Sequence, residues 1–168
     1  AVSERLDKKM FGPPVAVPLT SFMEGRGRPR SGPVDGAGRR TVYQEVRRNF
    51  LSPMMLAFDM PQPLSTFGRR TTSNVPAQAL IMMNDPFVVE QSKLWAKRLL
   101  ATGPDDAARV RAAYALAFSR EPSAAEQTTA AAFLTTQAKA HGEAQPGEKA
   151  WADFCHALFN VKEFVFVN

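Results

Sequence analysis

The amino-acid sequence predicts an all-α protein, an irregular bundle of about five to six helices wrapped by an N-terminal arm rich in proline, glycine and arginine. Three observations indicate this fold. Apolar residues recur at helical spacing through the second half of the chain, and helix-capping residues stand before several of these segments. No stretch alternates apolar and polar residues as a long half-buried strand does. We therefore expect residues 1–40 to form the arm and residues 41–168 the helical domain.

The arm should be irregular, because its prolines exclude long helices and its glycines favour turns and extended backbone. The prolines stand at positions 13, 14, 18, 29 and 33, and the glycines concentrate between positions 25 and 38. Apolar side chains nevertheless recur along it, which predicts that the arm packs across the helical body. These are Phe11, Val15, Val17, Leu19 and Phe22.

The middle of the chain predicts three short helical segments. Residues 41–50 place Val42, Val46 and Phe50 on one side of a helix. Ser52 and Pro53 begin a further turn, since serine caps helices and proline suits the first helical position. Residues 76–83 are almost wholly apolar, so the sequence predicts a short buried helix there.

Longer helices are expected from Asp85 onwards. Asp85 is a good N-cap and Pro86 a good first residue for a helix over 86–100, with apolar residues on one face. Acids in the first turn favour a helix over 105–118, and Ser123 with Glu126 forms a capping box before 124–140. A last helix over 148–160 carries an apolar stripe. The stripe consists of Trp151, Phe154, Cys155, Leu158 and Phe159.

The positive charge is concentrated in the first half of the chain. The net charge is +5, and nine arginines but only four acids lie between Glu24 and Arg70. Arginine binds carboxylates, phosphates and sulfates with two parallel hydrogen bonds, so one interpretation is a surface for an anionic ligand or partner. The other is a codon bias combined with arginines that brace loops through backbone carbonyls. The candidate binding residues are Arg26, Arg28, Arg30, Arg39, Arg40, Arg69 and Arg70.

No arrangement of residues in the sequence indicates catalysis, so we assign no catalytic residue, metal site or cofactor. His141 and His156 lie in different segments without metal-ligand spacing, and Cys155 stands in an apolar stripe, as a core thiol does. Asp59 and Asp85 are the acids that a shared active site would use, although both also stand at helix ends, where capping accounts for them.

The hydropathy of the chain and its first residues indicate neither a membrane span nor a secretory signal. No apolar run approaches the roughly 18 to 20 residues that cross a bilayer, and the first ten residues lack the apolar core of a secretory signal. The chain does not begin with methionine, which suggests a fragment of a longer protein.

Several segments together resemble one family. GRRTVYQEVRRNFLSPMMLAFDMPQP, TFGRRTTSNVPAQALIMMNDPFVVEQSKLWAKRLL and WADFCHALFNVKEFVFVN, with EGRGRPRSGP before them, resemble the C-terminal domain of unknown function in planctomycete cytochrome c-containing multidomain proteins. The resemblance covers most of 38–168. It implies a haem-attachment module and a further domain ahead of this one, and a location outside the cytoplasm, in the periplasm or secreted. The haem motif itself is not in this chain.

Three functional hypotheses follow. The first is a non-catalytic helical domain that docks preceding domains of the same polypeptide or another partner. The second is an arginine-lined module for a sulfated or acidic polysaccharide. The third is half of an active site that a preceding domain completes, with Asp59, Asp85, Arg69 and Arg70. Nucleic acid is disfavoured as a partner by the extracytoplasmic setting that the resemblance implies.

Overall fold

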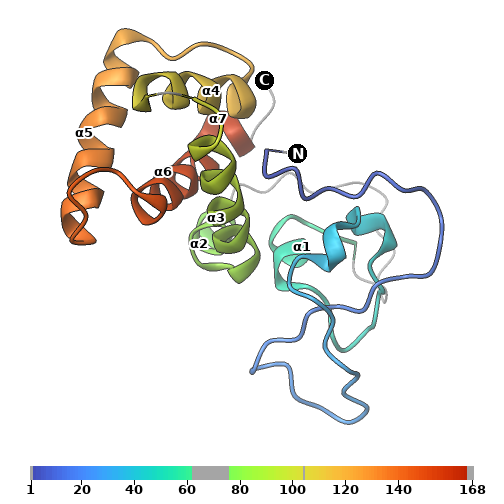
Figure 1. Ribbon diagram of the computed structural model, residues 1–168. Coiled ribbons are helices and arrows are strands. Elements are labelled where there is room, and N and C mark those ends of the chain that lie inside the picture. The colour runs from blue at the N-terminus through green and yellow to red at the C-terminus, as the bar shows by residue number, and fades with distance from the viewer. Residues whose placement is uncertain (1, 62–75, 104, 166–168) are drawn as a thin grey trace. The chain divides into compact units, whose positions relative to one another are not determined.

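The computed structural model describes residues 2–61, 76–103 and 105–165, and these residues contain seven α-helices and no β-strand. The predicted all-α class is confirmed. The chain forms two compact units (Figure 1), Arg5–Phe87 on the one hand and Ala1–Glu4 with Val88–Asn168 on the other. The domain boundary expected at residue 40 stays a prediction.

The unit that contains Val88–Asn168 is a helical bundle. Its helices are α3 (Pro86–Leu100, of which the first two residues belong to the other unit), α4 (Asp106–Phe118), α5 (Ala124–Ala140), α6 (Glu148–Phe159) and α7 (Lys162–Val165). Helix α5 packs against α6 and α4, and α7 contacts α4 and α6 (Figure 1). The predicted helices 86–100, 105–118, 124–140 and 148–160 are thus confirmed to within one residue at each end.

Side-chain caps account for where these helices begin. Those of Asp85 and Ser123 are the predicted ones, whereas Asp105, expected within the first turn, is the N-cap itself. Asp85 Oδ1 accepts the Phe87 N–H at 2.8 Å, and Asp105 Oδ1 accepts the Ala108 N–H at 2.7 Å. Ser123 and Glu126 form the reciprocal capping box, each accepting the other's backbone N–H. These contacts satisfy backbone donors that a helix start leaves without partners.

Aromatic side chains fill the core of this unit. Trp95 and Trp151 are fully buried, and ring centroids lie 5.2 Å apart for Trp95–Phe159 and 5.6 Å apart for Trp151–Phe154. The predicted apolar stripe of α6 is therefore core. Residues 2–4 join the same unit through α3, where Arg98 pairs with Glu4 at 2.7 Å and donates to the Val2 carbonyl at 2.8 Å.

Arg120, in the turn after α4, links two helices that no sequence pattern connects. Its guanidinium makes paired hydrogen bonds of 2.8–2.9 Å to Glu126 at the start of α5 and of 2.8 Å to Glu163 in α7. Hydrogen bonds from Arg120 lower the pKa of Glu126 from 4.5 to about 2 and also lower the pKa of Glu163. This bidentate pairing holds α7 against the α4–α5 turn.

This cluster predicts a specific loss of stability in acid. A carboxyl whose folded pKa lies below its unfolded pKa stabilises the fold above the unfolded value, and the contribution is lost as pH falls toward the folded value. The melting temperature of Arg120→Gln should therefore lie below that of the wild type at pH 7, and the gap should narrow between about pH 4.5 and pH 2. Arg111→Gln, an exposed arginine of α4, is the matched control. A gap that stays constant with pH would contradict this role for Arg120.

The described residues of the Arg5–Phe87 unit form loops with a few short helices. These are the 3₁₀ turns Gly36–Gly38 and Thr41–Tyr43, α1 (Pro53–Ala57) and α2 (Pro76–Asn84). Residues 7–15 run parallel to residues 39–44, with isolated bridges that pair Asp7 with Arg39 and Val15 with Gln44. Helix α1 packs against α2. The predicted helices that begin at Pro53 and Pro76 are confirmed.

The predicted helix over 41–50 is wrong. Only Thr41–Tyr43 make a single 3₁₀ turn, and the backbone then pairs with Val15, whose N–H donates to Tyr43 O and whose carbonyl accepts from the Glu45 N–H, both at 2.8 Å. Val42 is 78% exposed and Val46 is also exposed, whereas Phe50 is buried. Branched side chains fit extended backbone better than a helix, and here pairing with a distant segment decides the conformation.

Two expectations about burial also need correction. Helix α2 forms as predicted, but Leu80 on it is 59% exposed and Met83 is exposed as well, so its apolar sequence does not mean that the whole helix is buried. In the arm, Val17 is buried, whereas Phe11 and Phe22 are exposed. A short helix and a loop bury only the face that meets a neighbour.

Candidate binding cavity

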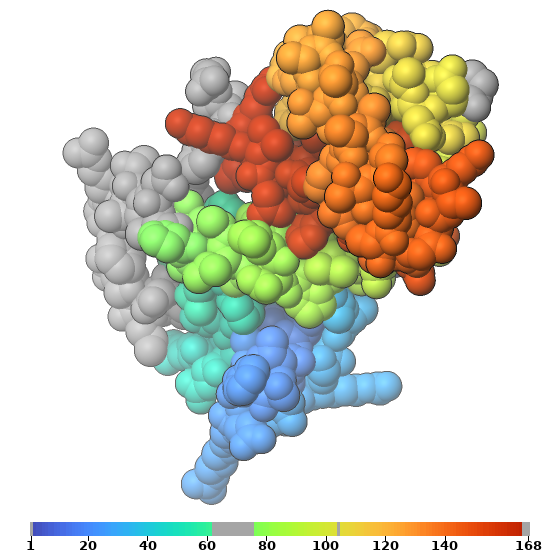
Figure 2. All heavy atoms as spheres, turned by 90° about the vertical axis from the view of Figure 1, so that its left-hand side faces the viewer, coloured from blue at the N-terminus to red at the C-terminus, as the bar shows by residue number. Residues whose placement is uncertain are grey.

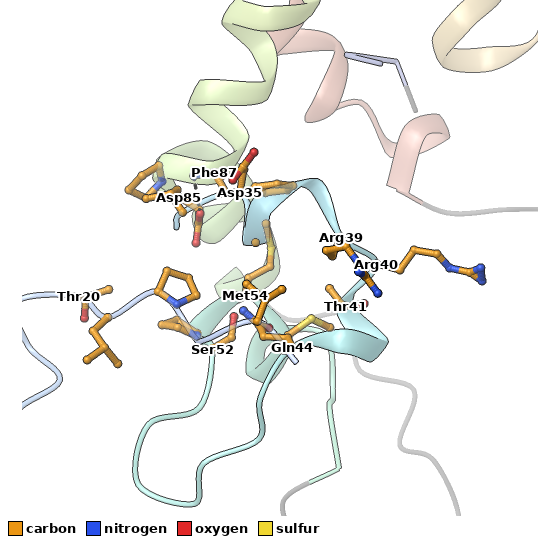
Figure 3. Close-up of a pocket in the computed structure, with 18 of the residues that line it drawn as sticks. Thr20, Asp35, Arg39, Arg40, Thr41, Gln44, Ser52, Met54, Asp85 and Phe87 are labelled. Carbon is orange, nitrogen blue, oxygen red and sulfur yellow. Dashed lines mark hydrogen bonds between the residues drawn. The ribbon is translucent and has the colours of Figure 1, made fainter. Parts of the chain in front are cut away.

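The Arg5–Phe87 unit contains a cavity of about 500 Å³. Four stretches surround it: residues 15–22, residues 34–44, the start of α1, and residues 85–87. Figure 3 shows Met54 between the acidic residues Asp35 and Asp85 on one side and Arg39 and Arg40 on the other. The apolar part of the lining is the larger part and consists of Val15, Pro18, Leu19, Phe22, Val34, Pro53, Met54, Met55, Pro86 and Phe87.

One edge of the cavity belongs to loop 19–31, which extends away from the rest of its unit (Figure 1). Two hydrogen bonds of 2.9 Å close its base, from Gly32 N to Val17 O and from Leu19 N to Ser31 Oγ. Gly32 is required there, since a Cβ would lie only 1.9 Å from Ala16 O. The loop presents Phe22 with 94% of its surface exposed. Figure 2 shows narrow groups of atoms that project from the blue, N-terminal part of the chain.

Arg39 is a bracing residue of the cavity wall. Its Nη2 donates to the Phe11 carbonyl at 2.8 Å, and its guanidinium lies 4.1 Å from the centre of the Tyr43 ring. Tyr43 Oη in turn accepts the Phe11 N–H at 2.8 Å, and Asp7 lies 4.0 Å from Arg39 Nε. This is the loop-bracing role that the second interpretation of the arginines predicts.

The other described candidate arginines are exposed. Arg40 lines the cavity and extends away from the other labelled side chains in Figure 3. Its hydrogen-bond partner among the described residues is Met10 Sδ, 3.9 Å from its Nη1. Arg26, Arg28 and Arg30 lie on loop 19–31, and within the described part of the chain no ion pair joins them to a carboxylate. Arg69 and Arg70 lie outside the described residues.

The acids of the cavity are already engaged. Asp35 pairs with Arg5 at 2.7 Å and also accepts the Ala37 N–H, and Asp85 caps α3. Asp59 follows α1 with a left-handed φ of 57° and is not part of the lining. The structure therefore brings Arg39, Arg40 and Asp85 to one cavity, and leaves Asp59 and loop arginines 26, 28 and 30 outside its lining.

Sequence reasoning missed the apolar residues that shape the cavity. Adjacent methionines usually fill gaps in a core, and Phe22 is predicted to pack on the helical body, yet Met54, Met55 and Phe22 all line the cavity. One signal was present: Phe22 is a large apolar residue in a loop of glycine, proline and arginine. The methionine pair is ambiguous by nature, because methionine serves both irregular cores and adaptable binding surfaces.

The cysteine and histidine that the sequence singles out have structural neighbours outside the cavity. Cys155 is buried in α6, and desolvation raises the pKa of its thiol, which leaves it in the neutral form of a core residue. His141 Nε2 lies 2.7 Å from Asp153 Oδ2 at the surface. In residues 2–61, 76–103 and 105–165, no three His, Cys, Asp or Glu side chains come together as a metal site.

A family match covers the whole cavity. Residues 1–134 match the family described as PSD1: Protein of unknown function (DUF1553). The chain belongs to this family. The matched DUF1553 region includes every cavity residue and extends into α5 as far as Leu134, so α6 and α7 follow it. No curated protein and no solved structure matches the chain.

Among the described residues, none of the helices has the length and hydrophobicity needed to span a membrane.

Proposed function

We propose that the Arg5–Phe87 unit is an interaction domain, which docks a preceding domain of the same polypeptide or another protein in its apolar cavity. The observation that carries this function is the mostly apolar lining of the 500 Å³ cavity, with Phe22 left 94% exposed at its edge. Covering apolar surface contributes about 25 cal/mol per Å², and large exposed apolar residues grouped around a hollow mark interaction sites.

The resemblance stated above supports the wider setting of this proposal. We infer that the chain follows a haem-attachment module in a longer planctomycete protein outside the cytoplasm. In that setting the docking function joins this domain to its neighbours, and any electron transfer belongs to the other segment.

The docking function predicts that a neutral apolar molecule enters the cavity. In protein carrying ¹³C-methyl methionine, N-acetyltryptophanamide should shift the signals of Met54 and Met55 in a saturable way, because both line the cavity. Met10 and Met83, which are exposed but not part of the lining, serve as internal controls. Equal shifts at all four methionines, or none at Met54 and Met55, would refute the function.

A second candidate function is the binding of a sulfated or acidic polysaccharide, which the exposed arginines of loop 19–31 favour. Heparin should then bind the chain, and its affinity should fall steeply with salt, since exposed charges are screened within about 8 Å at physiological ionic strength. Replacing Arg28 and Arg30 by alanine together should weaken binding, whereas Arg111→Ala, a similarly exposed arginine elsewhere, should not. Unchanged heparin affinity in the double variant would rule out polysaccharide binding through these arginines.

A further inference from the structure

We infer that the occupant of the cavity is an acidic peptide segment that inserts one bulky apolar side chain between Phe22 and the Met54–Met55 pair. This inference rests on the proposed docking function and names the chemistry of the partner. Two features carry it: the shape and polarity of the cavity, and the arginines around it that have no carboxylate partner among the described residues.

The cavity favours an apolar anchor on a peptide. Its volume of about 500 Å³ admits a large side chain, and its lining is largely apolar. Met54 and Met55 lie in the lining, where flexible thioethers adapt to aliphatic and aromatic groups alike. Gln44 and Ser52 add an amide and a hydroxyl to the lining, groups that suit the backbone of a bound peptide. A sulfated sugar chain has no comparable apolar group to place there.

The charges favour an acidic segment. Asp35 is neutralised by its ion pair with Arg5, whereas Asp85 accepts the Phe87 N–H as the cap of α3 and keeps its negative charge. The excess of positive charge around the cavity therefore comes from Arg40 and from the arginines of loop 19–31. Arg39 is held by the Phe11 carbonyl and the Tyr43 ring. Arg40 remains as an exposed cation of the lining, without a carboxylate partner in the described part of the chain.

Loop 19–31 adds to this positive field. It contributes four residues to the cavity wall, Leu19 to Phe22, and it carries Arg26, Arg28 and Arg30 but only one acid, Glu24. A ligand held at Phe22 therefore leaves the cavity beside an arginine-rich loop. Carboxylates on either side of an apolar anchor match this arrangement of cations around an apolar hollow.

The test measures binding of a short fluorescein-labelled peptide, with one central Trp flanked on both sides by Asp and Glu, to the 168-residue chain. Two control peptides have Ser in place of Trp, or Asn and Gln in place of the acids. The Trp peptide should bind at least about tenfold more tightly than either control. Its affinity should also fall with added salt, whereas that of the amide peptide should not.

Variants of the chain locate the site. Phe22→Ser and Arg40→Glu should each weaken binding about tenfold or more, and Val46→Ser and Arg48→Glu, exposed residues outside the lining, should leave it unchanged. Because Phe22 is 94% exposed, Phe22→Ser should leave the melting temperature unchanged. An unchanged melting temperature shows that weaker binding of this variant does not come from a folding defect. Equal losses in test and control variants would overturn the inference.

The remaining outcomes separate this inference from the docking function. If N-acetyltryptophanamide shifts the Met54 and Met55 signals while the acidic peptide binds no more tightly than its amide counterpart, the inference fails and docking stands. If neither molecule binds, both fail. Displacement of the labelled Trp peptide by heparin at lower concentrations than by the unlabelled peptide overturns the inference in favour of a polysaccharide site.

Discussion

Replacing Trp151 with alanine should lower the free energy of unfolding of the helical unit by about 3 to 5 kcal/mol. Trp151 is 0% exposed and packs edge to face on Phe154. Its indole N–H has no acceptor among the described residues, so the substitution removes packing and apolar burial without removing a hydrogen bond of that group. The cost is that of the lost burial together with the cavity left behind.

Chemical denaturation followed by circular dichroism measures this change. Leu116→Ala on α4, at a residue that is 37% exposed, is the matched control and should cost less than about 1 kcal/mol. Phe154→Ala should behave like Trp151→Ala, because both side chains belong to the same buried stripe. A loss below about 1 kcal/mol for Trp151→Ala would mean that α6 does not form the core.

Gly38→Ala should destabilise the Arg5–Phe87 unit by more than about 2 kcal/mol, the sum of a backbone cost and a steric cost. Gly38 has a φ of 72°, in the left-handed region that costs other residues about 1 to 2 kcal/mol. In addition, an alanine Cβ would lie 2.3 Å from the Arg5 carbonyl oxygen, and overpacking of this kind costs about 1 to 3 kcal/mol. The Gly38 carbonyl accepts the Asp7 N–H at 2.8 Å, so the clash falls where residues 7–15 are joined to residues 39–44.

Gly36→Ala separates the two contributions. Gly36 has a φ of 58°, but an alanine Cβ at this position would have no other atom within 4 Å, so its substitution carries only the backbone cost. Hydrogen exchange at the Asp7 and Val15 amides, both bonded across to residues 38–43, reports local opening directly. If Gly36→Ala and Gly38→Ala opened these amides equally, the predicted clash of the new Cβ at position 38 with Arg5 would add nothing to the backbone cost.

The helical unit could be predicted from sequence because its signals are local. The stripe of α6 and the capping residues Asp85, Asp105 and Ser123 lie within one or two turns of the helices that they define. The helix predicted over residues 41–50 does not form, because this segment pairs with Val15, about thirty residues earlier. Helical spacing of apolar residues holds no information on such a pairing. The exposure of Leu80 was missed for a similar reason, since composition does not reveal which face of a helix meets a neighbour.

The candidate site was predicted only in part. Arginines and aspartates stand out by their chemistry, and the structure brings Arg39, Arg40 and Asp85 to the cavity. Their different roles depend on three-dimensional neighbours: Arg39 braces the Phe11 carbonyl, whereas Arg40 is exposed. The cavity itself joins stretches between residues 15 and 87, and no local pattern in the sequence marks such a hollow.

The most direct measurement of the docking function is an isotope-filtered NOE spectrum of ¹³C-methyl methionine protein with the unlabelled Trp peptide. We expect contacts from the Trp ring to the methyl groups of Met54 and Met55, which line the cavity. Contacts to Met83, exposed on α2 and outside the lining, without contacts to Met54 and Met55, would contradict it.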